Sequence, residues 1–133
     1  MQFLDTASRL HIFTIKQCVK FPKRYTFYVS QDIASVSGQI LDFAKCANSI
    51  YPTNAHEAQM RRDYLLQAYA KTQSLISFIG DAKELFDISG GIMSEWMELI
   101  QTELRLLRGA MKNDKQRFQK FESKDAAATA EAI

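Results

Sequence analysis

Metal-binding and catalytic residues are scarce in this sequence. Its 133 residues include two cysteines and two histidines, and their spacing fits no zinc-binding pattern. His56-Glu57 begins like the helix of a zinc protease, but Met60 stands where that helix carries its second histidine. Bundles that hold two iron ions combine inward-facing glutamates with Glu-x-x-His motifs. Four glutamates were candidates for such motifs, and none has a histidine three residues later: Glu84, Glu95, Glu98 and Glu103.

Other signs of catalysis are missing as well. Gly90-Gly91 is not followed by a phosphate-binding fingerprint, and no strand pattern precedes it. No serine, threonine or cysteine is paired with a suitable base in the pattern of a nucleophilic enzyme. We therefore expect no enzymatic activity, no cofactor, no bound metal and no small-molecule substrate.

Signals for secretion and membrane insertion are also lacking. Residues 1–5 have neither a charged n-region nor a continuous apolar run, and no apolar stretch approaches the length of a membrane span. If residues 20–25 join antiparallel helices, Cys46 lies roughly 30 Å from the turn that Cys18 adjoins. A disulfide needs Cα atoms within about 7 Å. These features predict a cytoplasmic protein without membrane contact, and with both cysteines reduced.

The sequence has little net charge and few helix breakers. Lysine and arginine exceed aspartate and glutamate by two, so an anionic partner has to be attracted by a local patch. The two prolines stand at the first two breaks of the helical pattern. Pro22 lacks an N–H and disfavours the α conformation at Phe21, so a helix ends there. The other breaks are Tyr51-Pro52-Thr53-Asn54 and residues 87–91, where Asp87 or Ser89 can cap the following helix.

Between the breaks, apolar residues recur with helical spacing. The pattern predicts helices over about residues 2–19, 25–50, 55–86 and 92–112. Because the connections are short, consecutive helices are expected to be antiparallel, which gives an all-α, up-down-up-down four-helix bundle over residues 1–112. Residues 113–133 are predicted to contain a helix extension and a flexible, Ala-rich tail from Ala126 to Ile133.

The apolar stripes predict which faces are buried. The first helix has a main stripe of Leu4, Ser8, Ile12, Ile15 and Val19, which Phe3, Ala7, Leu10 and Phe13 widen. The second has the most regular one: Val29, Ile33, Val36, Ile40, Phe43, Ala47 and Ile50. This spacing of four and three residues is typical of bundle cores. The third and fourth helices each carry two stripes, and so wide an apolar arc predicts contact with a second subunit.

One acidic residue interrupts these stripes. Glu103 stands on the apolar side of the fourth helix, where a charge requires a partner. We expect a structural ion pair with a cation, in preference to a catalytic role.

Cations gather at both predicted ends of the bundle. Lys20, Lys23 and Arg24 lie at the turn after the first helix, at the same end as four acids: Asp81, Glu84, Asp87 and Glu95. The opposite end has fewer acids, and its candidate nucleic-acid-binding residues are Arg61, Arg62, Arg105, Arg108 and Lys112. The last three share a helix face with Lys115. Several cations on one face can bind phosphates, and a solvated face is an equal alternative for one isolated subunit.

The sequence resembles a known family at the first turn and in the last helix. Phe21-Pro22-Lys23 followed by a long helix, Trp96, and the run from Leu104 to Arg108 are similar to S23-type intervening-sequence four-helix bundle proteins. They also resemble the related accessory variability determinant proteins of diversity-generating retroelements. The resemblance covers about residues 3–112. The chain departs from the accessory determinants in its mild charge and in a neutral turn at residues 51–54.

The resemblance implies a ring-like homo-oligomer, a homopentamer of four-helix bundles. The retroelement branch implies binding of RNA or an RNA–DNA hybrid, and a reverse transcriptase partner. In a ring each basic patch repeats around the axis, which strengthens binding through multivalency. The intervening-sequence branch implies an alternative function, a homo-oligomeric scaffold with no nucleic-acid role.

Overall fold

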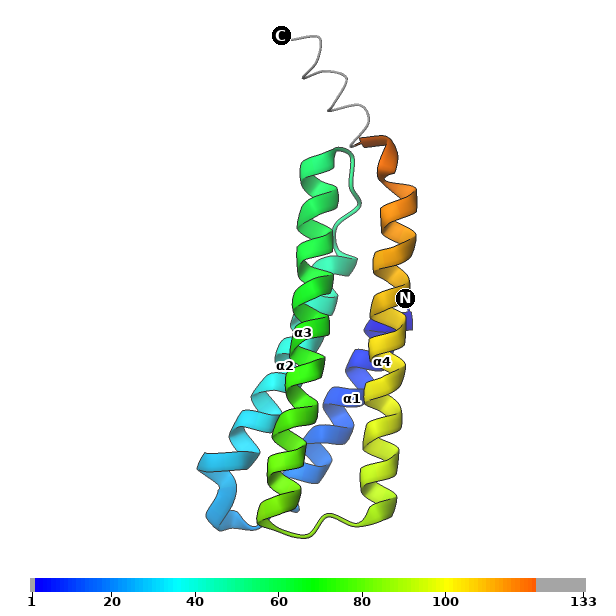
Figure 1. Ribbon diagram of the computed structural model, residues 1–133. Helices are drawn as coiled ribbons and strands as arrows, with labels where there is room; N and C mark the ends of the chain where they lie inside the picture. The colour runs from blue at the N-terminus through cyan, green and yellow to red at the C-terminus, as the bar shows by residue number, and fades with distance from the viewer. Residues whose placement is uncertain (1, 122–133) are drawn as a thin grey trace.

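Four long helices make up most of the computed structural model, which describes residues 2–121 (Figure 1). They are α1 (Gln2–Cys18), α2 (Gln31–Asn48), α3 (Ala55–Leu85) and α4 (Gly90–Arg117). Helix α1 packs on α2 and α4, and α3 packs on α2 and α4. The described part of the chain has no strand. The predicted all-α bundle is confirmed, and the predicted oligomeric ring stays a prediction.

The helix bounds differ from the predicted ones mainly after the first turn. The pattern predicts one helix from residue 25, but a 3₁₀ turn (η1, Lys23–Tyr25) and a π-helical turn (η2, Thr26–Ser30) precede α2. Aromatic packing explains why this segment is not regular helix. The Phe86 ring lies between Phe21, at a centroid distance of 4.7 Å, and Tyr25, at 5.3 Å. These contacts fix the position of Tyr25 at the end of the bundle. The π-helical turn η2 then connects Tyr25 to the start of α2.

Helix ends follow the predicted capping. The Asn54 side chain accepts a hydrogen bond from the Glu57 amide at 2.9 Å, and the Glu57 carboxylate accepts one from the Thr53 amide at 2.8 Å. The hydrogen bonds from Thr53 also hold the pKa of Glu57 below its usual value. Ser89 caps α4 by accepting from the Ile92 amide. Helix α4 continues past residue 112 to Arg117, as the predicted extension requires; the Ala-rich tail lies outside the described residues.

Helix α1 buries a different face from the predicted one. Its core residues are Phe3, Ala7, Leu10, Thr14 and Cys18, whereas Ile12 is 52% and Val19 77% exposed. Thr14 explains the choice of face, because its hydroxyl accepts a buried hydrogen bond of 3.0 Å from the Trp96 indole N–H. The main stripe on α1 was therefore the wrong core face, and the residues that widen it form the core.

The stripe predicted for α2 is confirmed. Five of its residues are buried, and Phe43 and Ile50 are half-buried. On α3 the core line combines members of both predicted stripes: Leu65, Thr72 and Ile79 from the first, and Ala68, Leu75 and Ala82 from the second. The flanking Tyr69, Ile76 and Phe78 are half-buried against the same core. Most of the wide apolar arc on α3 is thus used inside the chain itself.

The cysteines agree with their prediction. Both are free thiols, and burial raises the pKa of Cys18 to about 11. Within residues 2–121, no helix has the length and apolar character needed to cross a membrane.

Candidate nucleic-acid interface

Helices α3 and α4 extend beyond α1 and α2 at one end of the bundle (Figure 1). This follows from their lengths, because α3 has 31 residues and α4 has 28, against 17 for α1 and 18 for α2. We call this region, the start of α3 with the end of α4, the basic end. The opposite region, where residues 19–25 meet the end of α3 and the start of α4, is the elbow end.

Arg61 is buried at the base of the basic end. Its Nε atom lies 2.6 Å from the Asp114 carboxylate, in a salt bridge whose two side chains are almost inaccessible. Its Nη1 atom donates to the Ala47 carbonyl at 2.9 Å. One guanidinium therefore joins α3 to α4 and bonds a carbonyl in the last turn of α2, where cations are favoured. The sequence analysis places Arg61 among the phosphate-binding candidates, but its Nε and Nη1 groups are bonded inside the protein.

Arg108 is held at the surface by an aromatic residue. Its Nη2 atom donates to the Tyr69 hydroxyl at 2.6 Å, and its guanidinium lies over the Tyr69 ring, 5.6 Å from the centroid. The hydrogen bond from Arg108 also lowers the pKa of Tyr69. Arg108 remains exposed, so α3 orients this cation and leaves its other N–H groups available.

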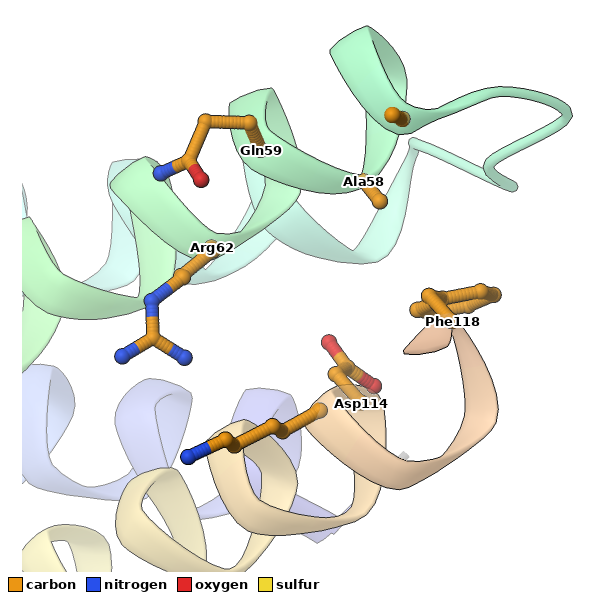
Figure 2. A pocket seen from close by; sticks show the side chains of 7 residues that line it. Ala58, Gln59, Arg62, Asp114 and Phe118 are labelled. Carbon is orange, nitrogen blue, oxygen red and sulfur yellow. The ribbon is translucent and has the colours of Figure 1, made fainter. Parts of the chain in front are cut away.

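Arg62 lines a cavity of about 230 Å³ between α3 and α4. Figure 2 shows its guanidinium directed from α3 toward α4, with the Asp114 carboxylate across the cavity and the Phe118 ring at its rim. The other lining residues are Ala55, Ala58, Gln59 and Lys115. The cavity lies in the part of α3 and α4 that extends beyond the other helices.

Arg105 lies on the other side of α4. It lines a cavity of about 450 Å³ between α1 and α4, together with Arg61, Asp114 and Arg117. Lys112 is exposed on α4. The cations predicted to share one face of α4 therefore border both α1 and α3: Arg105 faces the α1 side, while Arg108 and Lys115 face the α3 side.

Lys20, Lys23 and Arg24 are exposed at the elbow end, far from the other candidates (Figure 1). The Arg24 guanidinium lies 5.2 Å from the centre of the Tyr25 ring. Within the described residues, none of the three forms an ion pair with the nearby acids. The structure thus divides the predicted binding residues between two separate surfaces.

Three further residues of the basic end were not among the predicted binding residues. The Phe118 and Phe121 rings are stacked, 5.8 Å apart and 11° from parallel. The Arg117 guanidinium lies 5.1 Å from the centre of the Phe118 ring. The sequence pattern predicts only a helix extension for these two phenylalanines. Their i, i+3 spacing and the cation beside Phe118 were the available signals for an aromatic surface.

Glu103 is fully buried, as its position in the apolar stripe predicts, but the expected ion pair is absent from the described residues. Both carboxylate oxygens lack a hydrogen-bond partner there. Burial raises the pKa of this group to about 8. Glu103 lines neither cavity of the basic end. With this pKa the carboxyl is mainly protonated at pH 7, so it does not require a cation to balance its charge.

Comparison of this chain with protein families, with curated proteins and with solved structures gives no match.

Proposed function

We propose that the protein binds RNA or an RNA–DNA hybrid through its basic end. It does so as a non-enzymatic, cytoplasmic accessory subunit of a diversity-generating retroelement, beside a reverse transcriptase. One observation carries the binding proposal. Arg61 neutralises Asp114, so the acid closest to the cavities cannot cancel the neighbouring cations.

The charge balance around this ion pair favours an anionic partner. Within the described residues, no ion pair involves the exposed cations of this region: Arg62, Arg105, Arg108, Lys112, Lys115, Arg117 and Lys120. Three further acids lie nearby: Asp5 of α1 lines the cavity beside Arg105, Glu57 accepts from Thr53, and Asp63 accepts from Gln59. The exposed cations outnumber them. Each cation that meets a phosphate releases counterions, and binding then weakens as salt rises.

Electrophoretic mobility shift with structured retroelement template RNA, at low and moderate salt, tests the binding proposal. We expect binding that weakens steeply with salt. Replacing Arg62, Arg105, Arg108 and Lys112 with Ala should abolish most of it, because four phosphate contacts are lost. The matched control replaces Lys20, Lys23 and Arg24, which lie at the elbow end. Two results contradict the assignment to the basic end: an affinity that does not change with salt concentration, or a loss of binding only when Lys20, Lys23 and Arg24 are replaced.

The reverse transcriptase partner rests on the sequence resemblance and needs its own test. Co-expression with the reverse transcriptase of the same retroelement, followed by size exclusion, should give a complex of both chains. A retroelement template repeat and a reverse transcriptase gene beside the gene for this chain would support the pairing. A reverse transcriptase that elutes alone at micromolar concentrations of both chains contradicts it.

A homo-oligomeric scaffold is the second candidate function, and exposed apolar residues favour it. Ile12 and Ile15 of α1 and the adjacent Val19 are exposed, and Phe27 and Tyr28 of η2 are 75% and 80% exposed. Contiguous exposed apolar residues mark association sites. Light scattering should report a multiple of the 15.2 kDa chain mass, five in the proposed ring. A monodisperse monomer excludes both the scaffold and the ring.

A further inference from the structure

The cavity between α3 and α4 combines features that nucleic-acid backbone binding does not require. We propose that it holds the base of one unpaired nucleotide in a single-stranded segment, stacked on Phe118, with the flanking phosphates bound by Arg62 and Lys115. The inference rests on the proposed function, and it adds a structural class of substrate: single strand, as distinct from duplex.

The volume of the cavity fits a single base. Its volume of about 230 Å³ is below the roughly 300 Å³ at which pockets for drug-sized ligands begin. The small side chains of Ala55 and Ala58 line one side of the cavity, and the Phe118 ring stands at the rim (Figure 2). A flat base can enter between them, whereas the sugar and phosphates have to stay outside.

Phe118 has the surroundings of a stacking platform. It is half-buried, so its position is held by the protein. Phe121 is stacked near it at 11°, and the Lys120 ammonium lies 5.2 Å from the centre of the Phe121 ring. Aromatic rings with adjacent cations are a common means of binding single strands, because every base has a π-face to stack on.

The charge in the cavity comes from side chains and is positive. The Asp114 carboxylate is neutralised by Arg61, which leaves Arg62 and Lys115 uncompensated at the lining. An anion at the mouth of the cavity therefore meets two cations.

A duplex cannot use this cavity. Its bases are stacked on one another and paired, so no base face is free to lie on Phe118. Its phosphates can still contact the outward cations Arg108 and Lys112. The basic end thus contains two kinds of contact, one shared by any nucleic acid and one specific to unpaired nucleotides.

Fluorescence anisotropy tests this with a labelled oligouridylate and a blunt RNA duplex of the same length. Phe118→Leu keeps the apolar volume and loses the aromatic ring. We expect it to bind the single strand about tenfold more weakly, the scale of one lost stacking contact, and to bind the duplex as the wild type does. Phe118→Tyr should restore single-strand binding. Leu85→Ala is the control, since Leu85 is an exposed apolar side chain at the end of α3, near the elbow.

The salt dependence separates the two contributions. Arg62→Ala and Lys115→Ala should each reduce the slope of log K against log salt by about 0.7 on the single strand. Phe118→Leu should lower affinity at every salt concentration and leave the slope unchanged.

The outcomes distinguish this inference from the function on which it rests. A wild-type protein that binds neither RNA overturns both. A wild type that binds, with Phe118→Leu binding the single strand equally well, overturns the stacking site alone. Equal losses on single strand and duplex also overturn it, because they indicate a general change at the basic end.

Discussion

Different interactions stabilise the two ends of the bundle. At the elbow end, Phe21, Tyr25 and Phe86 pack ring against ring, and Phe21 reaches Trp96 at 6.2 Å. At the basic end, the salt bridge between Arg61 and Asp114 joins α3 to α4. Aromatic packing leaves the elbow cations beside uncompensated acids, whereas the salt bridge removes an acid from the cations around it. The electrostatic potential at each end therefore depends on the number of cations and also on whether the nearby acids are paired inside the protein.

Breaking the salt bridge should have the largest effect. Arg61→Ala leaves Asp114 charged, partly enclosed and unpaired, which costs about 3 kcal/mol of unfolding free energy. Urea denaturation measures the loss. Arg62→Ala is the matched control, because the neighbouring arginine is exposed and its removal should cost less than about 0.5 kcal/mol.

A double variant completes this test. Arg61→Met with Asp114→Leu removes both charges and should recover most of the lost stability. Equal stability of Arg61→Ala and Arg62→Ala would show that the salt bridge does not hold the basic end.

Glu103 should make stability depend on pH independently of either end. Its folded pKa of about 8 lies above the ordinary 4.5. Between these values the unfolded state releases a proton that the folded state retains, so the free energy of unfolding falls as pH rises. Glu103→Gln cannot titrate, and it should match the wild type near pH 4.5. Near pH 7 the unfolding free energy of Glu103→Gln should exceed that of the wild type by about 3 kcal/mol.

Urea denaturation of both proteins across this pH range measures the effect. Above pH 8 the folded carboxyl ionises too, and the difference should stop growing. Parallel profiles for wild type and Glu103→Gln would assign the pH dependence to other groups. The control Glu98→Gln changes an exposed glutamate of the same helix and should follow the wild type.

Removing the central ring of the elbow end should have an intermediate effect. Phe86→Ala deletes a half-buried side chain that two aromatic rings contact, which costs about 2 kcal/mol. The loss should be the same at low and high salt, because no charge is involved. Phe27→Ala, at an exposed ring of the same end, should change stability by less than about 0.5 kcal/mol. A loss that varies with salt would mean that charges also hold the elbow.

Local spacing predicts elements better than it predicts contacts. The regular stripe from Val29 to Ile50 is sufficient to identify the core face of α2. On α1, Ile12 and Leu10 are equally apolar, and the choice between their faces depends on a hydrogen bond from Trp96, 82 residues away. Arg61 looks like a surface cation until Asp114, 53 residues later, is placed beside it. The bundle was therefore predictable, and the division of its cations into buried and exposed was not.

The smallest effect compares two arginines that lie over tyrosines, one at each end. Arg108 contacts the ring of Tyr69 and also bonds its hydroxyl at 2.6 Å; Arg24 contacts the ring of Tyr25 and makes no hydrogen bond with its hydroxyl in the described structure. Tyr69→Phe keeps the ring and frees the guanidinium, so ordering Arg108 on a phosphate costs more entropy. RNA affinity should fall about twofold, with an unchanged salt slope because the number of charges is the same.

Anisotropy with the RNA duplex measures this, and Tyr25→Phe is its counterpart at the elbow end. That substitution removes no bond to a cation, so it should leave affinity unchanged. If the two variants weaken binding equally, the hydroxyl of Tyr69 has no special role in orienting Arg108. If only Tyr69→Phe weakens RNA binding, the two ends differ in two respects. The balance of charge is one, and the pre-ordering of a cation by a tyrosine hydroxyl is the other.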